Sequence, residues 1–117
     1  MSNTTEIGKR GERRAKWYLR FHGYRILEQN YRSGHHEIDL IAWERKSRTI
    51  VFVEVKARVR CDFGLPREAV HAKKQHFLRL AALKYLQSEG ATEQAARFDV
   101  IEVYREDGRI VHLKNAF

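Results

Sequence analysis

The feature that most constrains the fold of this chain is a pair of apolar segments, residues 35–43 and 49–57, joined by a short charged turn. The second segment begins as a nearly unbroken apolar run, so as a strand it would be buried on both faces. Such a strand belongs in the middle of a sheet that is covered on both sides. The short polar turn predicts that the two strands form an antiparallel hairpin. We therefore expect this hairpin at the centre of the fold.

Charged side chains interrupt the hairpin where apolar ones would be expected. On the first strand Glu37 and Asp39 are expected to share one face with Ile41, and on the second strand Glu54 and Lys56 share a face. If Asp39 lies opposite Glu54, then Glu37 lies opposite Lys56 and all four point the same way. Burying such charges costs several kcal/mol each unless they are paired or hold a metal. Because facing carboxylates repel each other, the pattern favours a divalent cation between them, and Mg²⁺ suits such a site.

The spacing of these residues matches a known signature. Asp39, followed after fourteen residues by Glu54-Val55-Lys56, resembles the PD-(D/E)xK signature of restriction-endonuclease-like nucleases. Further segments resemble the YraN-type family, small bacterial proteins of nuclease fold that are similar in outline to archaeal Holliday junction resolvases. These segments include Gly11-Glu12, Asn30-Tyr31-Arg32, residues 37–42 and 52–56, Lys74, residues 97–100 and residues 115–117. Two positions depart from the patterns: Ile38 replaces the Pro of the superfamily signature, and His36 replaces the usual Gly of the family.

The order of elements along the chain predicts the fold class. We expect a loose tail at residues 1–4, helices at residues 5–22 and 66–88, a loop at residues 59–65, and strands at residues 24–31, 35–43, 49–57, 97–104 and 109–113. This order predicts an α/β fold with a central mixed sheet of about five strands flanked by two main helices. The chain is long enough for a single domain, residues 1–117. The resemblance implies that this domain is restriction-endonuclease-like.

The resemblance also implies an activity, the metal-dependent hydrolysis of phosphodiester bonds in DNA. Asp39, Glu54 and the carbonyl of Val55 would bind Mg²⁺ or Mn²⁺, which polarises the scissile phosphate and activates a bound water. Lys56 would orient or help to deprotonate that water and offset developing charge.

Two acidic residues have both a functional and an ordinary interpretation. Glu12, on the first helix, would bind the metal or a second water, or else form an ordinary pair with Lys16 one turn later. Glu37 would hold Lys56 in place for catalysis. In a purely structural ion-pair network, Glu37 would also pair with Lys56, but the pair would only stabilise the fold and no metal would bind.

A different function is possible for the whole protein: a nuclease-fold module that binds nucleic acid or another protein without cutting.

The net charge of +8 and a pI of about 9.9 favour a polyanionic partner, and nucleic acid is the commonest one. The basic residues expected to contact its backbone are Arg13, Lys16, Arg32, Arg58, Lys73 and Lys74. Lys74 falls on the buried face of the second helix, so it either lifts its ammonium group to water or places it near the active site. No base-reading motif is present, which favours recognition of DNA shape over sequence. Charge alone would also suit a soluble basic protein or a membrane-surface binder.

Other features of the sequence bear on where in the cell the protein is located. The first twenty residues carry many charges and no apolar run, which argues against a signal peptide, and no stretch approaches a membrane span. The single cysteine, Cys61, cannot form an internal disulfide, which fits the cytoplasm. Asp99 is most simply a structural partner of Arg97 or of a helix lysine. The residues leave open whether the chain is a monomer or a homodimer.

Overall fold

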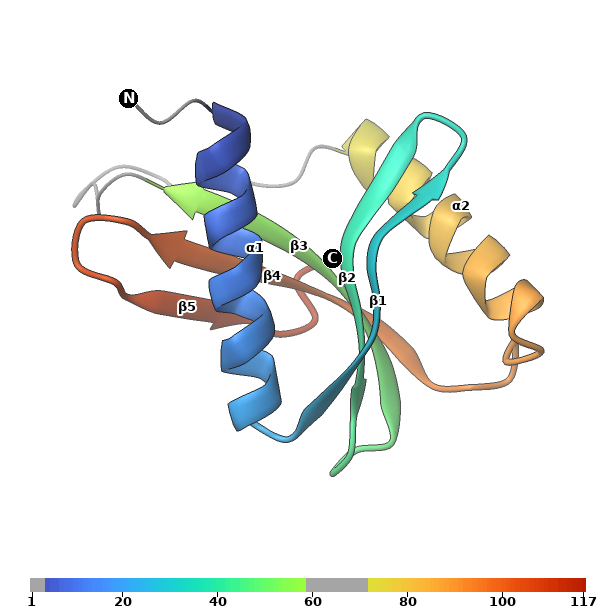
Figure 1. Ribbon diagram of the computed structural model, residues 1–117. Helices are drawn as coiled ribbons and strands as arrows, with labels where there is room; N and C mark the ends of the chain where they lie inside the picture. Colours follow the sequence, from blue (N-terminus) through green and yellow to red (C-terminus); the bar gives the residue numbers. More distant parts are fainter. Residues whose placement is uncertain (1–3, 59–71) are drawn as a thin grey trace.

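The structure, a computed structural model, describes residues 4–58 and 72–117 of the chain (Figure 1). Its elements in chain order are α1 (Thr4–Phe21), β1 (Tyr24–Ser33), β2 (His36–Glu44), β3 (Thr49–Arg58), α2 (Ala72–Ser88), β4 (Ala96–Tyr104) and β5 (Ile110–Leu113). The predicted elements are therefore all present. The expected loop at residues 59–65 and the expected helix start at Pro66 lie outside the described residues, as do residues 1–3 of the expected tail.

The strands form one five-stranded sheet in the order β1-β2-β3-β4-β5. Neighbouring strands are antiparallel except for β3 and β4, which are parallel. A parallel pair needs a long crossover, and here the connection contains α2. The predicted α/β class, with a mixed sheet of about five strands flanked by two helices, is confirmed.

The two helices cover opposite faces of the sheet and create two core layers (Figure 1). Ala15 and Leu19 of α1 pack on one face, in a layer with Val51 and Val53 of β3. The layer on the other face lies between α2 and the sheet and contains Phe52 of β3. The central strand is thus buried on both faces, as its apolar run predicted. No helix among the described residues is long and apolar enough to cross a membrane.

The central hairpin has the predicted register but departs from strict alternation beside Asp39. The β2–β3 ladder runs from Glu44↔Thr49 to Leu40↔Val53, the register in which Asp39 would face Glu54, and then stops. Ile38 and Ile41 both pack on the α2 side of the sheet, whereas Leu40 packs on the α1 side. The expectation that Ile41 shares a face with Glu37 and Asp39 is therefore wrong, because the alternation shifts by one between Ile38 and Leu40. The expectation that all four charged residues of the hairpin point the same way is wrong for the same reason. Asp39 meets Glu12 of α1, whereas Glu54 meets Lys74 of α2.

The second helix buries one face and exposes large apolar side chains beside it. Its described part buries Leu78, Ala81, Ala82 and Tyr85 against the sheet. Leu80 and Leu83 are each 45% exposed. The Phe117 ring closes the α2 side of the core by stacking on Phe98, with ring centroids 4.9 Å apart.

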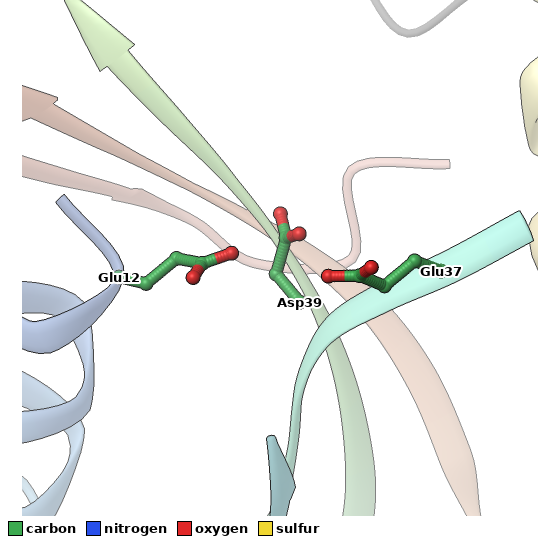
Figure 2. Close-up of side chains that lie close together, drawn as sticks. All are labelled: Glu12, Glu37 and Asp39. Atoms are coloured by element: carbon green, nitrogen blue, oxygen red, sulfur yellow. The ribbon is translucent and has the colours of Figure 1, made fainter. Parts of the chain in front are cut away.

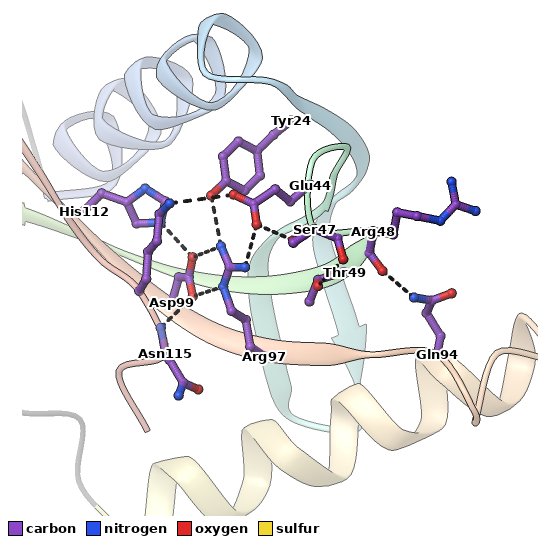
Figure 3. A network of polar contacts seen from close by, with 11 residues as sticks. Tyr24, Glu44, Ser47, Arg48, Thr49, Gln94, Arg97, Asp99, His112 and Asn115 are labelled. Carbon is purple, nitrogen blue, oxygen red and sulfur yellow. Dashed lines mark hydrogen bonds and ion pairs between the residues drawn. The ribbon is translucent and has the colours of Figure 1, made fainter.

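A buried polar network ties the other end of the hairpin to β4 and β5 (Figure 3). The Arg97 guanidinium donates to Asp99 Oδ1 at 2.9 Å, to Glu44 Oε1 at 2.7 Å and to the Tyr24 hydroxyl at 2.9 Å. Asp99 is fully buried and also pairs with His112 Nε2 at 2.7 Å. The expectation that Asp99 is a structural partner of Arg97 is confirmed.

Candidate metal-binding site

Three carboxylates from two elements converge on the α1 side of the hairpin (Figure 2). Glu12 comes from α1, and Glu37 and Asp39 come from β2. One oxygen from each lies within 4.8 Å of one from each of the others. Asp39 occupies the middle of the group, with the other two side chains reaching toward it from either side. We call these three residues the carboxylate cluster.

Local backbone geometry explains how Asp39 reaches the cluster. Its Oδ2 accepts a hydrogen bond from the Val55 amide at 2.8 Å. This bond forms just beyond the last backbone pair of the β2–β3 ladder, Leu40↔Val53. The Asp39 carboxylate thus takes the place of a backbone carbonyl of β2 as the acceptor for the Val55 amide, and this bond holds the side chain beside β3. The shift in alternation beside Asp39 is what allows Glu37, Asp39 and Leu40 all to lie on the α1 side.

Asn30 of β1 completes the carboxylate cluster, and the sequence reasoning assigned it no role. In the orientation that satisfies its hydrogen bonds, its amide nitrogen donates to Glu37 Oε1 at 2.7 Å and to Glu12 Oε1 at 3.2 Å. Its φ is +53°, a left-handed conformation that Asn tolerates better than most residues. An Asn inside an otherwise strand-like segment was the signal that could have drawn attention to it, because strands are depleted in Asn.

Burial, together with the neighbouring acidic groups, raises the pKa of Asp39 and of Glu12. Burial, the neighbouring charges of Glu54 and Glu12, and a close approach to the Glu12 carboxyl raise the pKa of Asp39, although the Val55 amide opposes the rise. Burial, followed by the charges of Glu37 and Glu54, also raises the pKa of Glu12, against the effect of its contact with Asp39. Raised carboxyl pKa values mean that burial and the neighbouring negative charges disfavour the ionised forms of these groups. A bound cation would favour those ionised forms.

The donor set fits a hard divalent cation. All of the ligands offered are oxygens, which Mg²⁺ and Mn²⁺ prefer. Ligand oxygens of an octahedral Mg²⁺ lie about 2.9 Å apart when adjacent and about 4.2 Å apart when opposite. The three cluster oxygens, which lie within 4.8 Å of one another, would therefore move closer together around the ion. The cluster borders a hollow of about 420 Å³, which leaves room for the waters and phosphate oxygens that Mg²⁺ retains. Its lining residues are Gly8, Lys9, Glu12, Asn30, Arg32 and Glu37.

The signature residues of β3 are arranged differently from the carboxylate cluster. Glu54 is buried and forms an ion pair with Lys74 of α2, yet its charge acts on both Asp39 and Glu12. Val55 contributes its amide to Asp39. Lys56 is partly exposed, and within the described part of the chain it forms no ion pair. The Glu37–Lys56 pair of the structural-network alternative is therefore absent there, and Glu37 pairs with Arg32 instead, with 3.4 Å between Nε and Oε2.

The predicted nucleic-acid contacts fall into two groups. Arg13 and Lys73 are exposed, and Lys16 is partly exposed. Arg32, Arg58 and Lys74 have acidic partners within the protein. Arg58 Nε donates to the buried Glu102 at 2.8 Å, Arg32 pairs with Glu37, and Lys74 pairs with Glu54.

The absence of a side chain at Gly11 allows α1, which carries Glu12, to pack closely on β3. A Cβ at Gly11 would lie 3.2 Å from the Cβ of Ala57, whereas one at Gly8 would meet nothing within 4 Å. We expect Gly8→Ala to raise the free energy of unfolding by about 0.5–1 kcal/mol through helix propensity alone. Gly11→Ala should lose that gain and lower the free energy of unfolding, because overpacking costs about 1–3 kcal/mol. Urea denaturation of the two variants tests this, and an equal gain in both would contradict it.

Comparison with known proteins places the chain in a family. The model of the uncharacterised protein family UPF0102 matches residues 11–103. The chain belongs to the UPF0102 family. UPF0102 proteins of similar length include one from Trichlorobacter lovleyi, 45% identical over 95% of this chain and 89% of that protein. Another, from Syntrophus aciditrophicus, is 47% identical over 100% of this chain and 92% of that protein. The predicted resemblance to the YraN-type family is confirmed.

Among solved structures, this UPF0102 protein is similar to SfsA of Pyrococcus furiosus in complex with Ca²⁺. The match covers 96% of this chain and 64% of that chain, with a TM-score of 0.41 and 17% sequence identity. A similarity this low assigns no chemistry to the UPF0102 chain.

Proposed function

We propose that this UPF0102 protein is a metal-dependent endonuclease that hydrolyses phosphodiester bonds of DNA and selects its substrate by structure rather than sequence. The observation that carries the proposal is the convergence of Glu12, Glu37 and Asp39, with the signature residues Glu54 and Lys56 on the adjacent strand. Acidic oxygens brought together from a helix and a strand, beside an open hollow, form a suitable site for a divalent cation and a phosphate.

Each residue has a proposed role. Asp39 and Glu12 would hold Mg²⁺ or Mn²⁺, with Glu54 and the Val55 carbonyl as further proposed ligands. When bound, the metal would supply Lewis-acid polarisation of the phosphate and a more acidic water. Lys56 would orient the attacking water and offset developing charge. Glu37, which is bound to Arg32 and Asn30, is better placed to position the cluster than to hold Lys56.

Lys74 is proposed to serve the site as a cation. Its ion pair with Glu54 supports this interpretation over a lysine that only lifts its ammonium group into water. The Lys74 ammonium would pair with Glu54 until substrate arrives, and then exchange to a phosphate oxygen.

The partner proposed for this chemistry is DNA. The net charge of +8 supports a polyanion, and Arg13 and Lys73 are exposed for backbone contacts. A cytoplasmic location fits such a partner, and a homodimer would be needed for paired incisions at a junction; both remain predictions.

The test is a cleavage assay on branched, flapped, single-stranded and duplex DNA with Mg²⁺, Mn²⁺ or EDTA. We expect cutting only with metal, and we expect Glu54→Ala to remove it. Glu93→Gln, which removes one exposed carboxylate away from the site, is the matched control and should cut normally. DNA binding without cutting under every metal would overturn the nuclease proposal and favour the non-catalytic binding module.

A further inference from the structure

Four arginines line a small pocket on the other side of α1 from the carboxylate cluster. Arg10 and Arg14 come from α1, Arg58 ends β3, and Arg105 follows β4. Gly11, Ala57 and Val103 complete the lining. Every charged residue among the described residues that line it is an arginine. We call it the arginine pocket.

The protein holds part of the arginine pocket in place. Arg14 donates to the carbonyl of Gly108 in the β4–β5 turn. Arg58 Nε donates to Glu102 Oε2 at 2.8 Å, and its side chain is only 24% exposed. The Arg105 amide donates to the Arg58 carbonyl at 2.8 Å, which fixes the backbone of one beside the other. Guanidinium groups anchored in this way lose little freedom when a ligand binds.

The positive charge of the arginine pocket favours the binding of an anion. An arginine keeps its charge throughout the physiological pH range, so repulsion among the four groups cannot be relieved by losing a proton. Glu102 is a buried carboxylate paired with one of them, Arg58. Arginine donors match the oxygens of phosphate groups in a forked, bidentate geometry.

The volume of the arginine pocket limits which anions can bind in it. The arginine pocket has a volume of about 110 Å³, well below the roughly 300–1,000 Å³ of sites for whole small molecules. It therefore has room for one phosphate group but not for a nucleoside. Its floor of Ala57, Val103 and Gly11 has no polar side chain that could recognise a base by hydrogen bonds.

We propose that the arginine pocket binds a single phosphate group of the nucleic-acid substrate, at a position other than the one that is cleaved. Gly11, which rests on Ala57, separates the pocket from the hollow beside Glu12. The two sites thus flank α1, a helix about 10 Å across with its side chains. The phosphate is either an internal phosphodiester or a terminal 5′-phosphate. The identity of the ligand as nucleic acid rests on the proposed function, but binding at the pocket does not require cleavage.

The experiment measures oligonucleotide binding in EDTA, so that no cleavage takes place. Arg10 and Arg105 are the residues to change, because both are exposed and neither guanidinium has a hydrogen bond or ion pair among the described residues. We expect Arg10→Gln/Arg105→Gln to weaken binding at least about tenfold, and to reduce the slope of log K against log salt by about 0.7–0.9, the value for one phosphate. Arg25→Gln/Arg45→Gln removes the same charge from exposed positions elsewhere and is the matched control.

Two oligonucleotides of the same sequence, with and without a 5′-phosphate, distinguish the sources of the phosphate. A preference for the 5′-phosphate that disappears in the pocket variant would assign the pocket to strand ends. Equal weakening of both oligonucleotides would assign it to an internal phosphodiester. If the pocket variant binds both as tightly as the control variant does, the inference is wrong, whatever the cleavage assay shows. Equal urea midpoints for the two double variants establish that both are folded.

Discussion

Asp39→Asn is expected to abolish metal-dependent cleavage, lowering its rate by about 10²–10³-fold or more, while DNA binding survives. Asn preserves the shape of the side chain, and its oxygen can still accept the Val55 amide. What it removes is the central charge of the carboxylate cluster. Cleavage and binding of the same DNA substrate, measured with Mg²⁺ and with EDTA respectively, test the separation of the two.

The same variant distinguishes a functional site from a structural one. Because burial and the charges of Glu54 and Glu12 disfavour the charged form of Asp39, removing its carboxylate should raise the free energy of unfolding in EDTA by about 1 kcal/mol. Glu93→Gln, an exposed charge removal, should leave it unchanged. A structural ion-pair network requires the opposite result, a clear loss of stability in Asp39→Asn with binding and cleavage reduced together. That outcome would contradict the proposed metal site.

Among the substitutions considered, Asp99→Ala is expected to cause the largest loss of stability, lowering the free energy of unfolding by about 3–5 kcal/mol. Asp99 is fully buried and accepts hydrogen bonds from Arg97, from His112 and from the amide of Asn115 (Figure 3). Its removal leaves the Arg97 guanidinium, only 16% exposed, without one of its two carboxylate partners. A domain with a typical 5–15 kcal/mol of stability would lose much of it. Urea denaturation measures the effect, with the exposed Glu106→Ala in the neighbouring turn as control.

The network also predicts how stability depends on pH. Burial alone would raise the pKa of Asp99, but hydrogen bonds from His112, Arg97 and the Asn115 amide together hold it below its usual value. A lowered native pKa means that the unfolded chain takes up protons first as the pH falls, so this contribution is present above about pH 4 and is lost below it. Between pH 6 and pH 3, wild-type protein should therefore lose more unfolding free energy than Asp99→Asn, which has no carboxyl to protonate. Equal losses in both proteins would refute this account of Asp99.

Much of the fold was predictable because its signals are local in the sequence. The apolar run of β3 predicted a central strand, and the charged turn before it predicted an antiparallel partner, as observed. The observed pairs follow the predicted register from Glu44↔Thr49 to Leu40↔Val53, but the ladder ends before Asp39 and Glu54 would pair. Glu12, Glu37 and Asp39 could likewise be named as candidates, since each belongs to a recognisable motif.

Only the tertiary structure decided which groups meet. Alternation alone placed Ile41 on the same face as Asp39, but the hydrogen bond of the Asp39 side chain to Val55 ends the ladder and shifts the pattern. Asn30 joins the carboxylate cluster through a left-handed backbone conformation that no periodicity predicts.

The sequence by itself determined where the strands lie, which strand is buried at the centre of the sheet and which acidic residues are candidates for the site. These properties follow from side-chain periodicity and charge. The placement of α1 on β3 determined the rest. The contact of Gly11 with Ala57 brings Glu12 to Asp39 on one side of the helix and Arg10 to Arg58 and Arg105 on the other. These groups lie far apart along the chain, so their proximity depends on how closely a helix packs on a strand, a property of both surfaces together.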